Sequence, residues 1–437
     1  MALTVKQLNA DASFLLTFEP ITPPNSLPGP DAEPFRILMD PWITGPSTIF
    51  HSMFSTATHR KLPCITSLRE LPEPDLVVIS QHKSDHCNEA TLRQLPPTGT
   101  KTLILAEPAA AKAIRSWKYF DKDKVRTIPR WENPRIAGKE TVLRIKVPSA
   151  VPGGAHGEVS VAFIPQKRDI KGLHAAIGIT YRPPPSRGQL SRALLTPPAT
   201  PKSRGSSISP QYPQRPHTPP SASPTTNALL LAPPTPPASP SLPSLRSVRS
   251  VSSLSAHACD RSVSVIFSPH GIAYRSIAAY ATSHLVSEAA LPLTALLHCF
   301  DAISNPWWFG GNISAGMTVG REIASTLGAR AWVSCHDGDK DIRGLVSRML
   351  KTKKHGREEV AEMVSPRAGA FVGDKAKNDK GLKAGSAGTE VMVLGIGEEV
   401  ALTSEGVWNV EEASSAPMAC LEELGRLPST EEVIMQS

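Results

Sequence analysis

A long proline-rich segment divides this chain and sets the first limit on its fold. The chain has 437 residues and 43 prolines, and the prolines concentrate between Pro183 and Ala258, among serine, threonine and alanine. This segment contains no aspartate or glutamate. Such a composition buries too little apolar surface to offset the entropy of ordering the chain. We therefore expect residues 183–258 to be a disordered insert between two blocks that form one folded body.

The insert also explains the basic character of the chain. Its basic residues are Arg187, Arg192, Lys202, Arg204, Arg215, Arg246 and Arg249. They account for nearly all of the formal net charge of +8. The isoelectric point of about 9.2 therefore describes the insert and not a basic folded surface. Nucleic-acid binding has no support on this basis.

Several serines and threonines of the insert precede proline, namely Thr196, Thr200, Ser209, Thr218, Ser223, Thr235 and Ser239. Proline-directed kinases would add negative charge at such positions. The Pro-x-x-Pro segments of 183–258 match ligands of SH3 and WW domains. Because composition alone produces such matches, a passive spacer is the alternative role of the insert.

Cysteine usage and the absence of apolar runs indicate where the protein resides. The six cysteines are widely separated and have no paired spacing, which is typical of free thiols in a reducing compartment. The N-terminus lacks the apolar region of a secretory signal and is not an arginine-rich transit sequence. No apolar run is long enough to cross a bilayer. We expect a cytoplasmic protein.

Apolar periodicity predicts an α/β protein, because strands alternate with helices in both blocks. In the first block we expect strands at 13–18, 35–39, 76–79, 102–106, 125–128, 142–147, 159–164 and 176–181, and helices at 89–94 and 109–117. In the second block we expect strands at 262–267, 293–299 and 331–334, and a helix at 317–327. Strands at 390–394 and 399–402, separated by a Gly-Ile-Gly turn, predict a terminal hairpin.

Metal-ligating side chains follow the ends of several buried strands. Asp85 and His86 lie in the polar loop after strand 76–79, and His336 follows strand 331–334. His270 and Asp301 follow the two strands between them in the second block. Loops at strand ends are where rigid scaffolds present catalytic groups. A carboxylate combined with imidazoles suits zinc or iron.

These segments resemble the metallo-β-lactamase superfamily, in particular its lactonase-like branch and divergent fungal members. Asp40-Pro41-Trp42 at the end of strand 35–39 is similar to an early strand end of that branch. The loop 81–86, Gln-His-Lys-Ser-Asp-His, falls on the HxHxDH signature of the superfamily, and the strand that ends at His336 matches the one that supplies its last metal histidine. The resemblance implies a four-layer αββα sandwich and a metal-dependent hydrolase.

The chain departs from the superfamily pattern at the ligands of one metal site. Gln81 and Lys83 stand where the first two signature histidines belong, and His82 is out of register by one residue. Pro165-Gln166-Lys167 stands where the middle histidine is expected, so that His174 is the nearby replacement. Pro269-His270 replaces the bridging aspartate. The resemblance therefore implies that one metal site has lost its ligands.

The surviving ligands predict a reduced site that holds one zinc ion or none. We expect Asp85, His86 and His336 to bind the metal, with His270 as a fourth ligand and Asp85 also as the catalytic residue. Asp301, His82 and Lys83 are candidates for supporting positions around them. A metal ion there would lower the pKa of bound water toward ~7 and supply hydroxide to an ester, lactone or phosphodiester of a small-molecule substrate. The alternative is a catalytically inactive member of the fold that serves as a binding or scaffold protein.

The resemblance divides the chain into five parts. Residues 1–182 and 259–350 are the two halves of the metallo-β-lactamase-like domain, separated by the insert 183–258. Residues 351–388 are expected to be a mobile lysine-rich segment, and residues 389–437 the terminal hairpin and a tail. The aromatic run Trp307-Trp308-Phe309 is expected to pack in the core, with the wall of an apolar pocket as its alternative role.

Overall fold

The computed structural model describes residues 1–21, 33–49, 51, 53–149, 153–169, 171–185, 261–309, 311–344, 347, 349–365 and 388–408. They belong to one compact unit, Met1–Arg187 together with Arg249–Ser437. The insert 183–258 lies outside the described residues except for 183–185. Its expected disorder, its phosphorylation sites and its SH3 or WW motifs therefore remain predictions.

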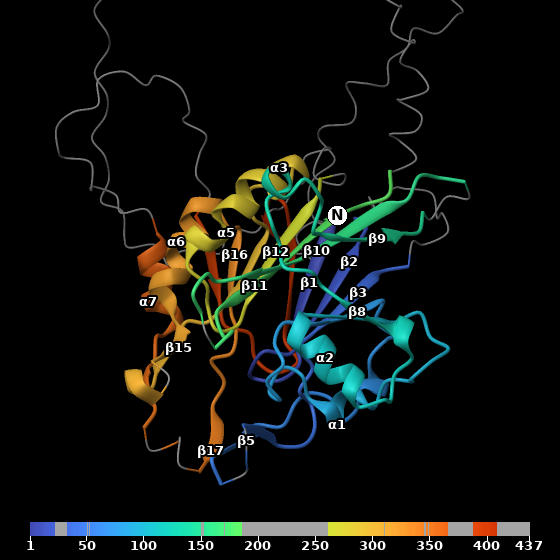
Figure 1. Ribbon diagram of the computed structural model, residues 1–437. Helices are drawn as coiled ribbons and strands as arrows, with labels where there is room; N and C mark the ends of the chain where they lie inside the picture. Colours follow the sequence, from blue (N-terminus) through green and yellow to red (C-terminus); the bar gives the residue numbers. More distant parts are fainter. Residues whose placement is uncertain are drawn as a thin grey trace, which may run out of the picture. The chain divides into compact units, whose positions relative to one another are not determined.

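Two large mixed sheets form the centre of this unit (Figure 1). The eight-stranded sheet has the order β21 (Gly406–Val407), β20 (Glu399–Thr403), β1 (Ala2–Gln7), β2 (Phe14–Glu19), β3 (Phe35–Met39), β6 (Leu76–Ile79), β7 (Leu103–Ala106), β8 (Val125–Thr127). The seven-stranded sheet has the order β19 (Glu390–Met392), β16 (Ala331–Ser334), β13 (Ala295–His298), β12 (Val263–Ser268), β11 (Ala175–Arg182), β10 (Gly157–Pro165), β9 (Leu143–Val147). Strands β3, β6, β7 and β8 pair in parallel, as do β12, β13, β16 and β19.

The apolar residues of single strands serve two different cores, because successive side chains point to opposite faces. In β6, Val78 belongs to the core between the two sheets, whereas Val77 belongs to the core beneath the helices of the first sheet. In β12, Phe267 faces the core between the sheets and Ile266 faces the helices of the second sheet. A continuous apolar run is what such a strand requires, since both of its faces are buried.

Helices cover the outer face of each sheet. The first sheet carries α1 (Glu89–Leu92) and α2 (Pro108–Ser116), and the second carries α5 (Tyr274–Tyr280), α6 (Met317–Leu327) and α7 (Arg357–Val364). The remaining helical turns are η1 (Leu68–Glu70), η2 (Lys122–Lys124), α3 (Pro134–Ala137), the π-helical η4 (Ala281–Leu285) and η5 (Trp307–Phe309). The order helix, sheet, sheet, helix confirms the predicted four-layer αββα sandwich. Among the described residues, no helix is long and apolar enough to span a bilayer.

Two small antiparallel sheets supplement the sandwich. One contains β17 (Lys340–Arg343), β5 (Ser55–His59) and β4 (Ser47–Ile49). The other contains β15 (Asn312–Ala315), β14 (Ala302–Ser304) and β18 (Lys351–Lys353). The strands of both small sheets are joined to the large sheets by loops at strand ends. Figure 1 shows β5, β17 and β15 on the same side of the sandwich. These sheets supply the walls of the cavity described below.

The end of the chain differs from the predicted terminal hairpin. Strand β19 pairs in parallel with β16 of the seven-stranded sheet, whereas β20 pairs antiparallel with β1 of the eight-stranded sheet. The Gly395–Gly397 turn joins the two sheets, and Gly397 donates its backbone N–H to Gln7 at 2.8 Å. Part of the segment 351–388, expected to be mobile, is also ordered: residues 351–353 form β18 and residues 357–364 form α7.

Acid sensitivity is expected from His298, the last residue of β13. Its side chain is fully buried, its Nδ1 lies 2.8 Å from the Cys299 carbonyl, and burial lowers its pKa to about 4. The unfolded chain therefore binds more protons than the folded chain between pH 6.5 and 4, so stability falls as the pH drops through this range. Between pH 6.5 and 5 the loss from this residue is about 2 kcal/mol.

Urea unfolding of the wild type and of His298→Gln at pH 6.5 and 5.0 measures this effect. The variant is expected to lose about 2 kcal/mol less over the same interval. His156→Gln, which changes an exposed histidine, serves as the control and should behave as the wild type. An equal acid-induced loss in His298→Gln and His156→Gln contradicts the assignment.

Candidate metal site

Three histidines from distant parts of the chain meet at the strand ends. His86 lies in the loop after β6, His270 in the turn after β12, and His336 two residues after the end of β16. One ring nitrogen from each lies within 4.8 Å of the other two, and all three side chains are buried. Among the described residues, this is the one group of three or more histidine, cysteine or acidic side chains with that geometry.

The orientation of His86 is fixed by Asp40, at the end of β3. Asp40 Oδ2 lies 2.8 Å from His86 Nδ1, and both side chains are fully buried. The backbone N–H of Ser80 donates to Asp40 Oδ1 at 2.7 Å, and the Ser80 hydroxyl donates to Oδ2. A carboxylate in this place accepts the Nδ1 proton, so that the lone pair of His86 is on Nε2.

His270 presents its own Nε2 to the same point. Its Nδ1 lies 3.1 Å from the carbonyl oxygen of Ile313, which can only accept a hydrogen bond. The Nε2 atoms of His86 and His270 are 3.1 Å apart. At this distance either a shared proton or a bound metal ion lies between the two nitrogens. Two nitrogens each ~2.0–2.1 Å from a tetrahedral zinc ion would be about 3.3 Å apart, so the pair fits a shared metal.

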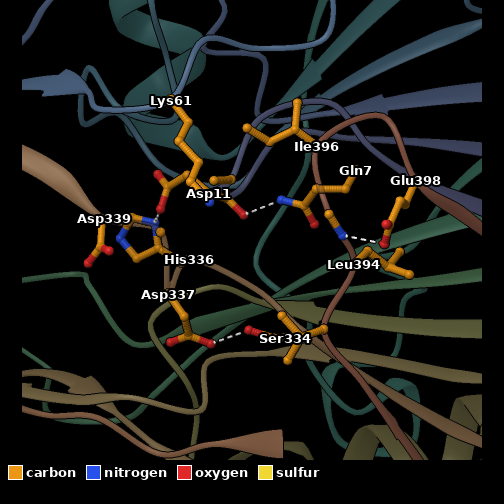
Figure 2. A pocket seen from close by; sticks show the side chains of 14 residues that line it. Gln7, Asp11, Lys61, Ser334, His336, Asp337, Asp339, Leu394, Ile396 and Glu398 are labelled. Carbon is orange, nitrogen blue, oxygen red and sulfur yellow. Dashed lines mark hydrogen bonds and ion pairs between the residues drawn. The ribbon is translucent and has the colours of Figure 1, made fainter.

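His336 is held in the same way by Asp11, in the loop between β1 and β2. His336 Nδ1 lies 3.0 Å from Asp11 Oδ1, and Lys340 Nζ lies 2.9 Å from Asp11 Oδ2. Figure 2 shows Asp11 and His336 side by side, with Gln7 donating to the backbone carbonyl of Asp11. His86 and His270 therefore have an acceptor at Nδ1, which leaves Nε2 for a metal. His336 Nδ1 lies beside the Asp11 carboxylate and also 3.3 Å from Lys340 Nζ.

Asp85 lies at the edge of this group. Its Oδ2 is 4.0 Å from His336 Nε2 and 3.9 Å from Lys340 Nζ. Its Oδ1 is buried and has no hydrogen-bond partner among the described residues. Burial raises the pKa of Asp85, but His86, Lys340 and His336 together bring it below the ordinary value. The carboxylate is therefore ionised and directed at the histidines, as a metal ligand or proton acceptor requires.

The protonation of the histidines follows from their surroundings. Burial, reinforced by the neighbouring His336 and His86, lowers the pKa of His270 well below its usual value. Burial also lowers the pKa of His336, and Asp11 only partly opposes this. The pKa of His86 is raised instead, because Asp85 and Asp40 outweigh the effect of burial. Neutral imidazole is the form that binds a metal.

The backbone at these strand ends is strained. Asp40 has a φ of 38° and His336 a φ of 67°, both in the left-handed region that non-glycine residues rarely adopt. The residue after His270 is Gly271, with a φ of 77°, and a Cβ atom there would lie 2.8 Å from the Ala315 Cβ. Strained residues of this kind gather at functional sites. Two of them here carry or orient a candidate ligand.

Not every residue predicted for the site lies in it. The His82 ring lies 3.6 Å from Glu107, at the start of α2, and its side chain is 41% exposed. Asp301 accepts a hydrogen bond from the His355 backbone at 2.9 Å and forms no hydrogen bond with His270 among the described residues. Neither residue has a hydrogen bond or ion pair to a candidate ligand within the described part of the chain. Lys83 does line the cavity beside Asp85.

The residues at the lost signature positions have other contacts. Gln81 is buried and donates to the Leu173 carbonyl at 2.7 Å. His174, the candidate replacement for the middle histidine, places its Nδ1 2.9 Å from the Gly271 carbonyl and is not among the clustered histidines. These side chains tie the turn after β12 to the β6 and β10–β11 loops. They do not form a second group of ligands.

Sequence reasoning missed three residues that complete the arrangement. Asp40 was noted only as the end of a strand, and neither Asp11 nor Lys340 was singled out for the site. Asp40 could have been found from its place directly after a buried strand. Asp11 and Lys340 have no such signal, because only the fold brings their loop and strand to His336.

Two cavities meet at His336. One, of about 460 Å³, is the cavity of Figure 2 and includes Asp11, Lys61 and Glu398 in its lining. The other, of about 590 Å³, is lined by Asp85, His270 and His336. More than one candidate ligand lines the second cavity, whereas only His336 lines the first. A substrate that reaches the metal would therefore occupy the larger cavity.

Part of the chain matches a known protein family. Residues 30–176 match the family model of the beta-lactamase superfamily domain, a range that includes Asp40, Asp85 and His86. Among solved structures, a novel metallo hydrolase from the hyperthermophilic archaeon Ignicoccus hospitalis is similar at 11% identity and a TM-score of 0.40, over 92% of this chain and 98% of that one. No curated protein matches significantly. The match over residues 30–176 and the αββα sandwich support a place for this chain in the metallo-β-lactamase superfamily.

Proposed function

We propose that this protein is a hydrolase that uses a single divalent metal ion, with zinc as the first candidate. The observation that carries the proposal is the convergence of His86, His270 and His336, in which His86 and His270 each have an acceptor at Nδ1. Three imidazoles with an open fourth position are a common ligand set of catalytic zinc. Manganese and iron accept similar sets, so the identity of the metal is left to measurement.

A divalent ion bound there would act as a Lewis acid and lower the pKa of water toward ~7. The protein residues then have separate tasks. Asp40 and Asp11 keep two imidazoles in the tautomer that ligates through Nε2. Asp85, at the edge of the group, accepts a hydrogen bond from the attacking water and takes its proton. Lys340 keeps a positive charge beside Asp85 and Asp11.

The proposal is for one metal ion and not two. Gln81 and Lys83 stand at the places of two signature histidines, and the ring of His174 is engaged with backbone carbonyls. The described residues contain no second cluster of ligands. A mononuclear site depends on its own proton acceptor, which is the role that we assign to Asp85.

The bond that is hydrolysed belongs to an ester, a lactone or a phosphodiester. In each of these, water attacks a polarised carbonyl carbon or phosphorus and an oxygen leaves. These three kinds of bond are also what the resemblance to the lactonase-like branch implies. A catalytically inactive protein of the same fold that serves as a binding or scaffold protein would show no turnover, with or without bound metal, and the following experiments separate the two.

Metal content tests the ligands directly. We expect the wild type to bind about one equivalent of zinc, and His86→Ala or His270→Ala to bind at least about 100-fold more weakly, since each loses one of three imidazoles. Competition with a chromophoric chelator measures the affinities. His82→Ala, in the same loop as His86, is the control and should retain the wild-type affinity. Equal affinity in His82→Ala and His86→Ala excludes the proposed site.

The positioning residues have a smaller expected effect. Asp11→Asn keeps the size of the side chain but weakens the contact with His336 Nδ1, so zinc affinity is expected to fall by about 10–100-fold. Thermal unfolding of the metal-free protein shows whether the fold persists. Addition of zinc should raise the melting temperature of Asp11→Asn less than that of the wild type. An unchanged zinc affinity would show that Asp11 does not orient the ligand.

The role of Asp85 is separable from metal binding. Asp85→Asn cannot take a proton, so kcat for an aryl ester, a lactone or a phosphodiester is expected to fall by about 10²-fold or more. Its zinc affinity should remain within about tenfold of the wild type, because Asp85 lies outside the three-histidine group. Glu89→Gln, on the exposed face of α1, is the control. Undiminished turnover in Asp85→Asn refutes this role.

A further inference from the structure

The larger cavity has a composition that indicates its ligand. Its volume is about 590 Å³, and one end is formed by Asp85, His270 and His336. Most of the remaining wall is apolar. Phe54, Trp308, Ile313, Ile342 and Leu350 come from the two small sheets and the segments beside them, and Leu173 comes from the loop between β10 and β11. A cavity of this size accommodates a small molecule with a hydrocarbon portion.

Trp308 contributes to this wall although it was expected in the core. Its side chain is 63% exposed, and that of its neighbour Trp307 is 88% exposed. Trp308 lines the cavity, whereas Trp307 does not. An exposed indole at the rim of an apolar cavity is costly in water and gains stability when a ligand covers it. Trp308 therefore lines an apolar cavity, which was the alternative to the expected packing in the core.

The charged residues of the same cavity are mostly cationic. Lys83, Lys171 and Lys340 line it, and Asp85 is its single acidic residue. Lys340 lies between Asp11 and Asp85, which offset its charge. Lys171 makes no ion pair within the part of the chain that the structure describes. The lining therefore has an excess of positive charge, which a bound metal ion would increase.

We propose that this cavity selects an amphipathic anion: a molecule with a hydrocarbon portion against Trp308 and its apolar neighbours, and an anionic group near Lys171 and Lys83. The inference deepens the proposed function, on which it rests for the role of the cavity as the substrate site. It narrows the substrate to esters or lactones that carry a phosphate or carboxylate together with an alkyl or aryl chain. Uncharged and short polar substrates are excluded from tight binding.

Binding of unreactive probes tests the proposal without any turnover. Isothermal titration of the full chain, in the presence of a chelator, compares octyl phosphate, octanoate, butyl phosphate and octanol below their critical micelle concentrations. Octyl phosphate or octanoate is expected to bind at least about tenfold more tightly than butyl phosphate and octanol, because the cavity rewards both the chain and the charge. The tighter of the two octyl anions identifies the head group.

Matched variants assign the effect to this cavity. Trp308→Ala is expected to weaken binding of the tighter octyl anion about tenfold, while Trp307→Ala leaves it unchanged. Lys171→Glu is expected to weaken it by a similar factor, while Lys146→Glu, an exposed lysine on β9, does not. Equal affinities for octanol and both octyl anions, or equal behaviour of the two tryptophan variants, overturns the proposal. Because no metal is present, failure here is distinct from failure of the metal site.

Discussion

The contact between each histidine Nδ1 and a fixed acceptor is the interaction on which the site depends. An imidazole ring without such a contact can rotate or exchange tautomers, and its lone pair then has no defined direction. Here the carboxylates of Asp40 and Asp11 and the carbonyl of Ile313 fix the rings of His86, His336 and His270. The acceptors come from three different parts of the chain. The site is therefore a property of the assembled fold and not of a local motif.

The two sheets explain how such distant residues meet. Within each sheet the parallel strands end at a common edge. Strands β3 and β6 of the first sheet and β12 and β16 of the second each carry a polar residue just beyond their ends. The apolar runs of these strands are buried on both faces, which anchors the loops that follow. Strain at Asp40 and His336 is tolerated there because the surrounding core over-determines the backbone. The packed core of the sandwich therefore keeps the candidate ligands in their positions.

Much of this fold could be predicted from sequence, because its strands are short apolar runs bounded by polar turns. Strands β3, β6 and β16 and helix α6 agree with the expected ranges to the residue. The separation of β19 from β20 could not be predicted, since Gly395–Gly397 has the composition of a hairpin turn and only its contact with Gln7 shows that it joins two sheets.

In the site, the strand ends indicated His86 and His336. The sequence placed His270 last among the ligands, whereas in the structure His270 belongs to the three-histidine group and Asp85 does not. Asp11 and Lys340 depend on long-range packing, which no local pattern encodes.

The central claim is that three imidazoles hold one metal ion. X-ray absorption of the zinc-loaded protein tests it most directly, since it reports the number and type of atoms around the metal. The account predicts three imidazole nitrogens at about 2.0–2.1 Å, one further light ligand, and no second metal at about 3.5–4 Å. Fewer than three imidazoles, sulfur from cysteine, or a neighbouring metal would contradict it.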